Sequence, residues 1–196
     1  MAAEPPDYSA GSTYHATRRH LASSTQKCVE GALEILGLPA SVLDLGCGEG
    51  AHLRWLHHEF ASRTVGVDLA IPKDADGVLW HHGDLRVPVD LGVTFEWVLC
   101  WEVAEHLPRE SSDILCDSLA CHLAKPHGRL LFTAAPPGQR GPGHINCQPQ
   151  AFWRLLLYDR GLVYQPLETH ELAAHWAQHV KQAPWYGRNV QVFAWA

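Results

Sequence analysis

VLDLGCGEG, residues 42–50, joins an apolar run to three glycines within one short stretch of the chain. The apolar residues predict a buried strand, whereas Gly46, Gly48 and Gly50 weaken a strand and permit unusual backbone angles. A glycine-rich turn between a strand and a helix lets a ligand rest against bare backbone, so we expect a ligand here. A tight turn that binds nothing is the alternative, because G-x-G-x-G alone is a weak signal.

Length and composition bound the possible classes of protein. The chain has 196 residues, of which 18% are charged, and a formal net charge of −6. We therefore expect one soluble domain, residues 13–196, after a flexible acidic tail at residues 1–12. The net negative charge disfavours a surface that binds nucleic acid nonspecifically. No apolar run approaches the length of a membrane span.

The start of the chain and the cysteines indicate the compartment. The first dozen residues lack the basic and apolar regions of a secretion signal. The six cysteines include no C-x-x-C pair, which favours reduced thiols over a disulfide framework. We expect a cytoplasmic protein.

Strand and helix signals alternate along the chain, which predicts an α/β three-layer sandwich with a doubly wound, mostly parallel sheet. Buried runs and turn residues predict seven strands, at 41–46, 63–70, 78–82, 95–101, 128–135, 163–168 and 189–196. Helices are expected at 17–36, 51–60, 110–124, 150–161 and 170–180.

Acidic residues end three successive predicted strands: Asp44, Asp68 and Asp84. The carboxyl ends of parallel strands meet at one edge, where ligands bind in doubly wound sheets. This edge suits a ligand with many hydrogen-bond donors and a cationic centre, and it suits a pyrophosphate badly because anion would face anion. Each aspartate could instead cap a turn.

Four motifs in order, VLDLGCGEG, VGVDL, GDL and FEWVLCWEVAEHL, resemble the class I methyltransferases that use S-adenosylmethionine. The resemblance extends over residues 40–165 and is closest to the subgroup with an E-V-x-E-H segment after the fourth strand. It implies a seven-stranded sheet whose last strand is antiparallel, with S-adenosylhomocysteine as product. A nicotinamide dehydrogenase fits less well, because Ala51 and His52 follow Gly50 and break the G-x-G-x-x-G pattern.

The resemblance also implies the residues that bind the cofactor. Asp44 and the backbone of the glycine turn would hold the methionine end, Asp68 the ribose, and Asp84 the adenine edge. The full implied set is Asp44, Gly46, Cys47, Gly48, Gly50, Asp68, Leu69, Gly83, Asp84, Leu85, Cys100, Trp101 and Glu102. A helical lid at about 13–37 would close over the cofactor, with Tyr14 and Arg18 as candidate contacts.

The acceptor should enter between the loops that follow the fourth and fifth strands. His144 is the first candidate for a general base, because imidazole titrates near neutrality, and His106 is the second. Each has a structural alternative: His144 and Asn146 could only hydrogen-bond their loop, and the Glu105–His106 pair could be architectural.

We expect no metal ion, although the chain has 14 histidines. The segment from His170 to His175 misses the H-E-x-x-H spacing by one residue. His175 and His179 share a helix face, but no third ligand is evident. The aromatic pair Trp185 and Tyr186 could line the acceptor site or pack in the core.

These observations together predict an enzyme that transfers a methyl group to an oxygen or nitrogen of a small molecule. One alternative is a protein, peptide or RNA methyltransferase that works with a partner. Another is a regulatory protein that binds the cofactor without turnover. The sequence does not indicate an oligomeric state.

Overall fold

The computed structural model describes residues 22–72 and 76–196, and its centre is a seven-stranded sheet. The strands are β1 (Ser41–Leu45), β2 (Arg63–Asp68), β3 (Leu79–His82), β4 (Trp97–Trp101), β5 (Arg129–Thr133), β6 (Leu162–Tyr164) and β7 (Gln191–Trp195). Their order is β3-β2-β1-β4-β5-β7-β6. The first five are parallel, and β7 runs antiparallel to both β5 and β6.

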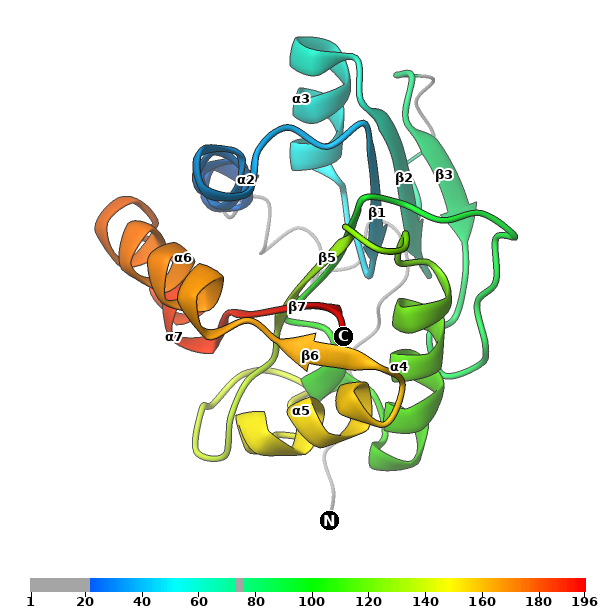
Figure 1. Cartoon of the computed structure of the whole chain (residues 1–196). Helices are drawn as coiled ribbons and strands as arrows, with labels where there is room; N and C mark the ends of the chain where they lie inside the picture. The colour runs from blue at the N-terminus through cyan, green and yellow to red at the C-terminus, as the bar shows by residue number, and fades with distance from the viewer. Residues whose placement is uncertain (1–21, 73–75) are drawn as a thin grey trace.

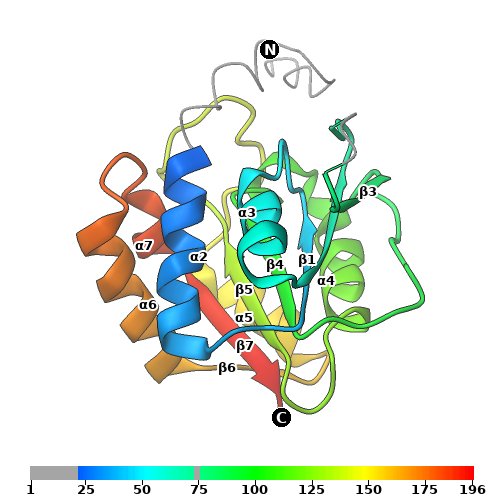
Figure 2. The same cartoon turned by 90° about the horizontal axis from the view of Figure 1, so that it is seen from above.

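Helices cover both faces of the sheet, which gives three layers (Figures 1 and 2). One face carries α2 (Ala22–Leu36), α3 (Ala51–Phe60), α6 (Pro166–His179) and α7 (Trp185–Asn189). The other carries α4 (Ser112–Cys121) and α5 (Gln150–Tyr158). Short 3₁₀ helices, η2 (Ala104–His106) and η3 (Arg109–Ser111), follow β4.

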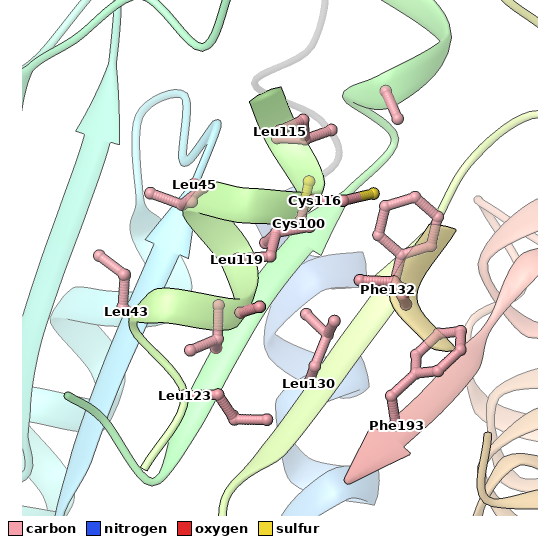
Figure 3. Close-up of a cluster of buried hydrophobic side chains, with 14 of the residues drawn as sticks. Leu43, Leu45, Cys100, Leu115, Cys116, Leu119, Leu123, Leu130, Phe132 and Phe193 are labelled. Atoms are coloured by element: carbon pink, nitrogen blue, oxygen red, sulfur yellow. The ribbon is translucent and has the colours of Figure 1, made fainter. Parts of the chain in front are cut away.

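Two apolar clusters hold the layers to the sheet. The cluster under α4 and α5 includes Leu43, Cys100, Leu119 and Phe132, all fully buried, and Figure 3 shows these side chains meeting between sheet and helix. The opposite cluster contains Trp101 and Trp176, whose rings meet edge to face. Since successive strand residues point to opposite faces, β4 supplies both clusters from one apolar run.

The order of connection reverses between β1 and β4. From β1 the chain moves outward to β2 and β3, then returns to add β4 on the other side of β1. A crevice forms at such a reversal because the loops after the two central strands leave in opposite directions. The glycine turn after β1 and the η2 segment after β4 therefore flank the expected ligand position.

The expected fold class is confirmed, including the antiparallel last strand. One strand prediction is wrong in extent: the run 163–168 is a strand only to Tyr164, and α6 begins at Pro166. Proline fixes its own backbone in an angle suited to the first helical turn, so it starts this helix. Helix α7 lies just before the last strand and was not expected.

The predicted lid coincides only in part with described residues. Residues 1–21, which include the predicted tail, Tyr14 and Arg18, lie outside them. Helix α2 buries Cys28, Val29 and Ala32 in the second cluster, and Cys28 accepts a hydrogen bond from the Trp176 indole. In the described residues no helix combines the length and hydrophobicity that crossing a bilayer requires.

Gly46 tests how tightly the turn is packed. A β-carbon at Gly46 would lie 2.3 Å from a methyl carbon of Val103, at a backbone φ of 91°. We expect Gly46→Ala to lower the free energy of unfolding by about 2–4 kcal/mol, from overpacking and backbone strain. Denaturant unfolding measures this. Gly92→Ala is the matched control, since φ at Gly92 is also positive but no described atom lies within 4 Å of an added β-carbon. Equal losses of unfolding free energy in the two variants would contradict the packing argument.

Candidate cofactor and acceptor site

Asp44 and His52 form a buried hydrogen bond at the tip of β1. His52 Nε2 lies 2.8 Å from Asp44 Oδ2, and both side chains are almost fully buried. The other carboxylate oxygen, Oδ1, is buried without a hydrogen-bond partner among the residues that the structure describes. Since buried acceptors are normally satisfied, this oxygen marks a place for a donor from a ligand.

The three glycines of the turn have different neighbours. Added β-carbons would meet Val103 at Gly46 and the Trp80 ring at Gly50, so these two glycines allow close packing within the protein. Gly48 has a φ of 54° and no described atom within 4 Å of its added β-carbon. Of the three, only Gly48 has open space where a side chain would lie; the cofactor contacts of all three stay predictions.

Asp68 fixes the glycine turn from the neighbouring strand. Its Oδ2 accepts a hydrogen bond of 2.8 Å from the backbone N–H of Gly48, and its Oδ1 accepts one from Ala70. The contact of Asp68 with the ribose, which the resemblance implies, stays a prediction. Gly83 joins the same edge by donating its N–H to the Asp68 carbonyl.

Asp84 lies at the end of β3, where a bidentate ion pair holds it to Arg86. The hydrogen bonds from Arg86 lower the pKa of the Asp84 carboxyl below its ordinary value, so this group is ionised at neutral pH. Leu85 is buried beside it and Leu69 is partly exposed. The adenine contacts of these residues stay predictions.

Cys47 and Cys100 are buried thiols. Burial raises the pKa of the Cys47 thiol well above its usual range, and the charges of Asp44 and Asp68 raise it further. Burial likewise raises the pKa of Cys100, which is fully enclosed under α4. Because the thiolate is the reactive form, neither group is a nucleophile at neutral pH.

Glu102 follows β4 in a left-handed backbone conformation, with φ of 56°. Its N–H donates to both the side-chain and backbone oxygens of Thr133, which fixes this strained turn to β5. Its carboxylate accepts hydrogen bonds from Asn189 Nδ2 at 2.9 Å and Gln139 Nε2 at 3.2 Å. A non-glycine residue is held in this region only where neighbours determine it, which is common at functional sites.

Glu105, His106 and His144 meet on the acceptor side of Glu102. Glu105 is completely buried, and its Oε1 lies 4.0 Å from His144 Nε2. The two imidazole rings meet edge to face at 4.9 Å between centroids. Burial raises the pKa of the Glu105 carboxyl well above its ordinary value, and the charge of Glu102 raises it further.

The loop that carries His144 is fixed to η2. Backbone N–H groups of Ile145 and Asn146 donate to the Glu105 carbonyl, and Asn146 Nδ2 donates to Ala104 and Ser112. Asn146 therefore has the structural role that we considered from the sequence. These bonds bring the sequence-predicted His106 and His144 together from separate loops.

Three polar residues of the site were not identified from the sequence. His52 was noted only because it breaks a nucleotide-binding pattern, although its place in the first turn of α3 puts it beside β1. Gln139 and Asn189 hold Glu102, yet Asn189 comes from a segment expected to be a strand. Tyr186 is buried and its ring lies 6.2 Å from that of Trp101, so it packs beside the site's central strand.

A family model described as a methyltransferase domain matches residues 14–185. The chain belongs to this methyltransferase family. With the fold described above, membership makes it a class I enzyme that uses S-adenosylmethionine and releases S-adenosylhomocysteine. The search of curated proteins gave no match.

Solved structures share the fold at low sequence identity. The sugar N-methyltransferase KedS8 from Streptoalloteichus is 17% identical, with a TM-score of 0.65 over 99% of this chain and 96% of that one. The plantazolicin methyltransferase BpumL, solved with S-adenosylhomocysteine and a substrate analogue, is 14% identical, with a TM-score of 0.63 over 93% and 88%. An O-methyltransferase from a Brevibacillus brevis trans-AT PKS multienzyme is 16% identical, with a TM-score of 0.61 over 93% and 75%.

The Asp44–His52 bond gives a prediction about stability. Replacing His52 by Ala leaves Asp44 buried with neither oxygen bonded, so we expect a loss of about 1–3 kcal/mol in the free energy of unfolding. His58→Ala, on the exposed side of α3, should change stability by less than about 0.5 kcal/mol. Denaturant titration of both variants measures the free energy of unfolding. Similar losses in the two variants would show that the buried Asp44–His52 hydrogen bond does not stabilise the fold.

Proposed function

We propose that this enzyme transfers the methyl group of S-adenosylmethionine to an oxygen or nitrogen of a small-molecule acceptor. The observation that carries the proposal is the glycine turn after β1: Gly48 has open space around its added β-carbon and donates to Asp68, and Asp44 on the preceding strand has a buried oxygen without a hydrogen-bond partner among the described residues. The protein's role is to bind the cofactor at this surface and to orient the acceptor beside its methyl group.

The residues at this edge fit a cationic nucleoside. In this proposal Asp44 Oδ1, which is buried without a hydrogen-bond partner in the described structure, accepts from the amino group of the methionine end, and Asp68 binds the ribose. Glu102 follows the adjacent strand β4 and accepts a hydrogen bond from Gln139 of the acceptor loop, so carboxyl groups occur on both sides of this edge. Such a field favours a positively charged ligand and disfavours a pyrophosphate.

The cofactor supplies a methyl group that is already activated for displacement. The chain must align the attacking atom, exclude water and receive any proton that the acceptor loses. The η2 segment and the His144 loop are bonded together and enclose Glu105 completely, which supports the exclusion of water at that point. His144 and His106 are the groups proposed to act on the acceptor's proton.

A small acceptor agrees with the size of the chain. The sheet and the helices that cover it account for most of the residues that the structure describes. KedS8 is described as a sugar N-methyltransferase, and the Brevibacillus relative as an O-methyltransferase of a multienzyme. The cytoplasmic location expected from the sequence stays a prediction.

The alternative functions make different predictions. A methyltransferase of RNA would bind its substrate with an affinity that falls steeply with salt, because phosphate contacts release counterions. A protein or peptide methyltransferase would need its partner before it turned over. A regulatory protein would bind S-adenosylhomocysteine tightly yet methylate no member of an acceptor library.

Calorimetric titration with S-adenosylmethionine and S-adenosylhomocysteine tests the proposal. We expect binding of one molecule per chain, and a loss of affinity of about 10- to 100-fold in Asp68→Asn, since a hydrogen bond to a charged group contributes about 1.5–3 kcal/mol. Asp90→Asn is the control, because Asp90 is exposed and its carboxylate accepts a hydrogen bond from the N–H of Gly92, two residues along its own loop. Absence of binding by the wild-type protein would overturn the function.

A further inference from the structure

Trp101, the last residue of β4, carries a buried polar atom without a partner. Its side chain is only 6% exposed, and its indole nitrogen Nε1 has no hydrogen-bond partner in the described structure. An indole N–H can only donate, and a buried donor that is left unpaired costs free energy. Since buried polar groups are normally satisfied, Trp101 requires an acceptor that the described residues do not supply.

Trp101 and Asp44 lie on the same face of the sheet. Asp44 pairs with Leu99 in the parallel register of β1 and β4, and side chains of neighbouring strands that are paired in this way share a face. Trp101 is two residues beyond Leu99, so its side chain returns to that face, nearer to the carboxyl edge of the sheet. Leu99 and Trp101 accordingly belong to one apolar cluster, the one under α2, α3, α6 and α7.

His52 connects the two side chains. Its Nε2 lies 2.8 Å from Asp44 Oδ2, and the other carboxylate oxygen of Asp44, Oδ1, is the buried acceptor without a partner in the described structure. The imidazole ring lies 5.5 Å, between centroids, from the Trp101 indole. The side chains that carry one unpaired acceptor and one unpaired donor therefore adjoin the same imidazole, at the strand ends beside the glycine turn.

The two unpaired atoms match the two charged groups of an α-amino acid. An ammonium group donates to a carboxylate oxygen, and a ligand's carboxylate accepts from an indole N–H. A ligand that offered only an ammonium group would satisfy Asp44 and leave Trp101 unpaired. S-adenosylmethionine and S-adenosylhomocysteine each carry both groups at the methionine end.

We propose that the Trp101 indole N–H binds the carboxylate of the cofactor's methionine end, while Asp44 accepts from the ammonium group. The inference rests on the proposed function, in which Asp44 Oδ1 receives that ammonium group. It assigns Trp101 a specific contact at the amino-acid end of the cofactor. Trp101 then selects for a nucleoside that carries a carboxylate over one that carries only an amine.

The other interpretation is a packing role, because the Trp101 ring meets Trp176 and Tyr186 edge to face. A buried water could then accept from the indole and donate to Asp44. Trp153 provides the comparison: it is buried on the other face of the sheet, and its indole nitrogen is also unpaired in the described structure. Trp153→Phe is therefore the matched control, since it removes the same N–H from a site that the cofactor is not expected to touch.

Three ligands separate the contacts by calorimetric titration. They are S-adenosylhomocysteine, S-adenosyl-3-thiopropylamine, which lacks only the carboxylate, and 5′-methylthioadenosine, which lacks the whole amino-acid end. The wild-type protein should bind S-adenosylhomocysteine about 10- to 100-fold more tightly than the amine, since a hydrogen bond to a charged group contributes about that much. Trp101→Phe should lower this ratio by about 10-fold or more.

The ratio between ligands isolates the hydrogen bond from packing, because a loss of packing weakens all three ligands alike. Asp44→Asn should weaken S-adenosylhomocysteine and the amine together, relative to 5′-methylthioadenosine, because both carry the ammonium group. Trp153→Phe should leave every ratio at its wild-type value. If Trp101→Phe does not fold, replacement of Trp101 by β-(3-benzothienyl)alanine, which keeps the ring size and lacks the N–H, gives the same test.

The outcomes distinguish this inference from the proposed function. If the Trp101 variants weaken all three ligands alike, if Trp153→Phe lowers the same ratio, or if the wild-type protein binds S-adenosylhomocysteine and the amine equally, the carboxylate contact is refuted and the proposed function stands. If the wild-type protein does not bind S-adenosylhomocysteine at all, the proposed function itself fails.

Discussion

The rest of the site depends on several carboxyl groups that are gathered, with little access to water, at one edge of the sheet. Asp44, Asp68 and Glu102 end neighbouring strands of the sheet, and Glu105 lies one turn further on. Carboxylates lose much hydration when buried, so each needs donors or a compensating charge. The protein supplies an imidazole to Asp44, backbone N–H groups to Asp68 and two amides to Glu102. The carboxylate oxygens without hydrogen-bond partners in the described structure belong to Asp44 and Glu105, which lie where the cofactor and the acceptor are expected.

These contacts also connect the cofactor side to the acceptor side. Gln139 donates to Glu102 through its side chain and accepts from His144 through its backbone carbonyl. Asn189, from the helix before the last strand, bonds both Glu102 and Gln139. The loops after β4, β5 and α6 are therefore held in one network, so the position of His144 depends on residues that touch neither ligand.

The sequence predicted the central strands well because burial on both faces requires continuous apolar runs, as in residues 97–101. It failed at residues 165–168, because the β-type residues Val163 and Tyr164 are followed, after Gln165, by a proline that begins a helix. The glycine motif was recognised from the sequence, but the different surroundings of Gly46, Gly48 and Gly50 were not. That difference arises from Val103 and Trp80, which only the folded chain brings against the turn. The sequence put His106 and His144 on the two loops expected to flank the acceptor, but it did not predict the contact between Glu105 and His144, which depends on how the two loops meet.

Strand β7 has a further consequence for how this molecule is made. It inserts between β5 and β6, both of which precede it in the chain. During synthesis, β1 to β5 can pair as they emerge, whereas β6 has no neighbour in the sheet until β7 is complete. The exposed side of β5 must therefore wait for a partner that is translated much later, and such an open strand is prone to pair with other chains. The last strand of the chain therefore completes this end of the sheet, whereas the nucleotide-binding half needs only strands that are made earlier.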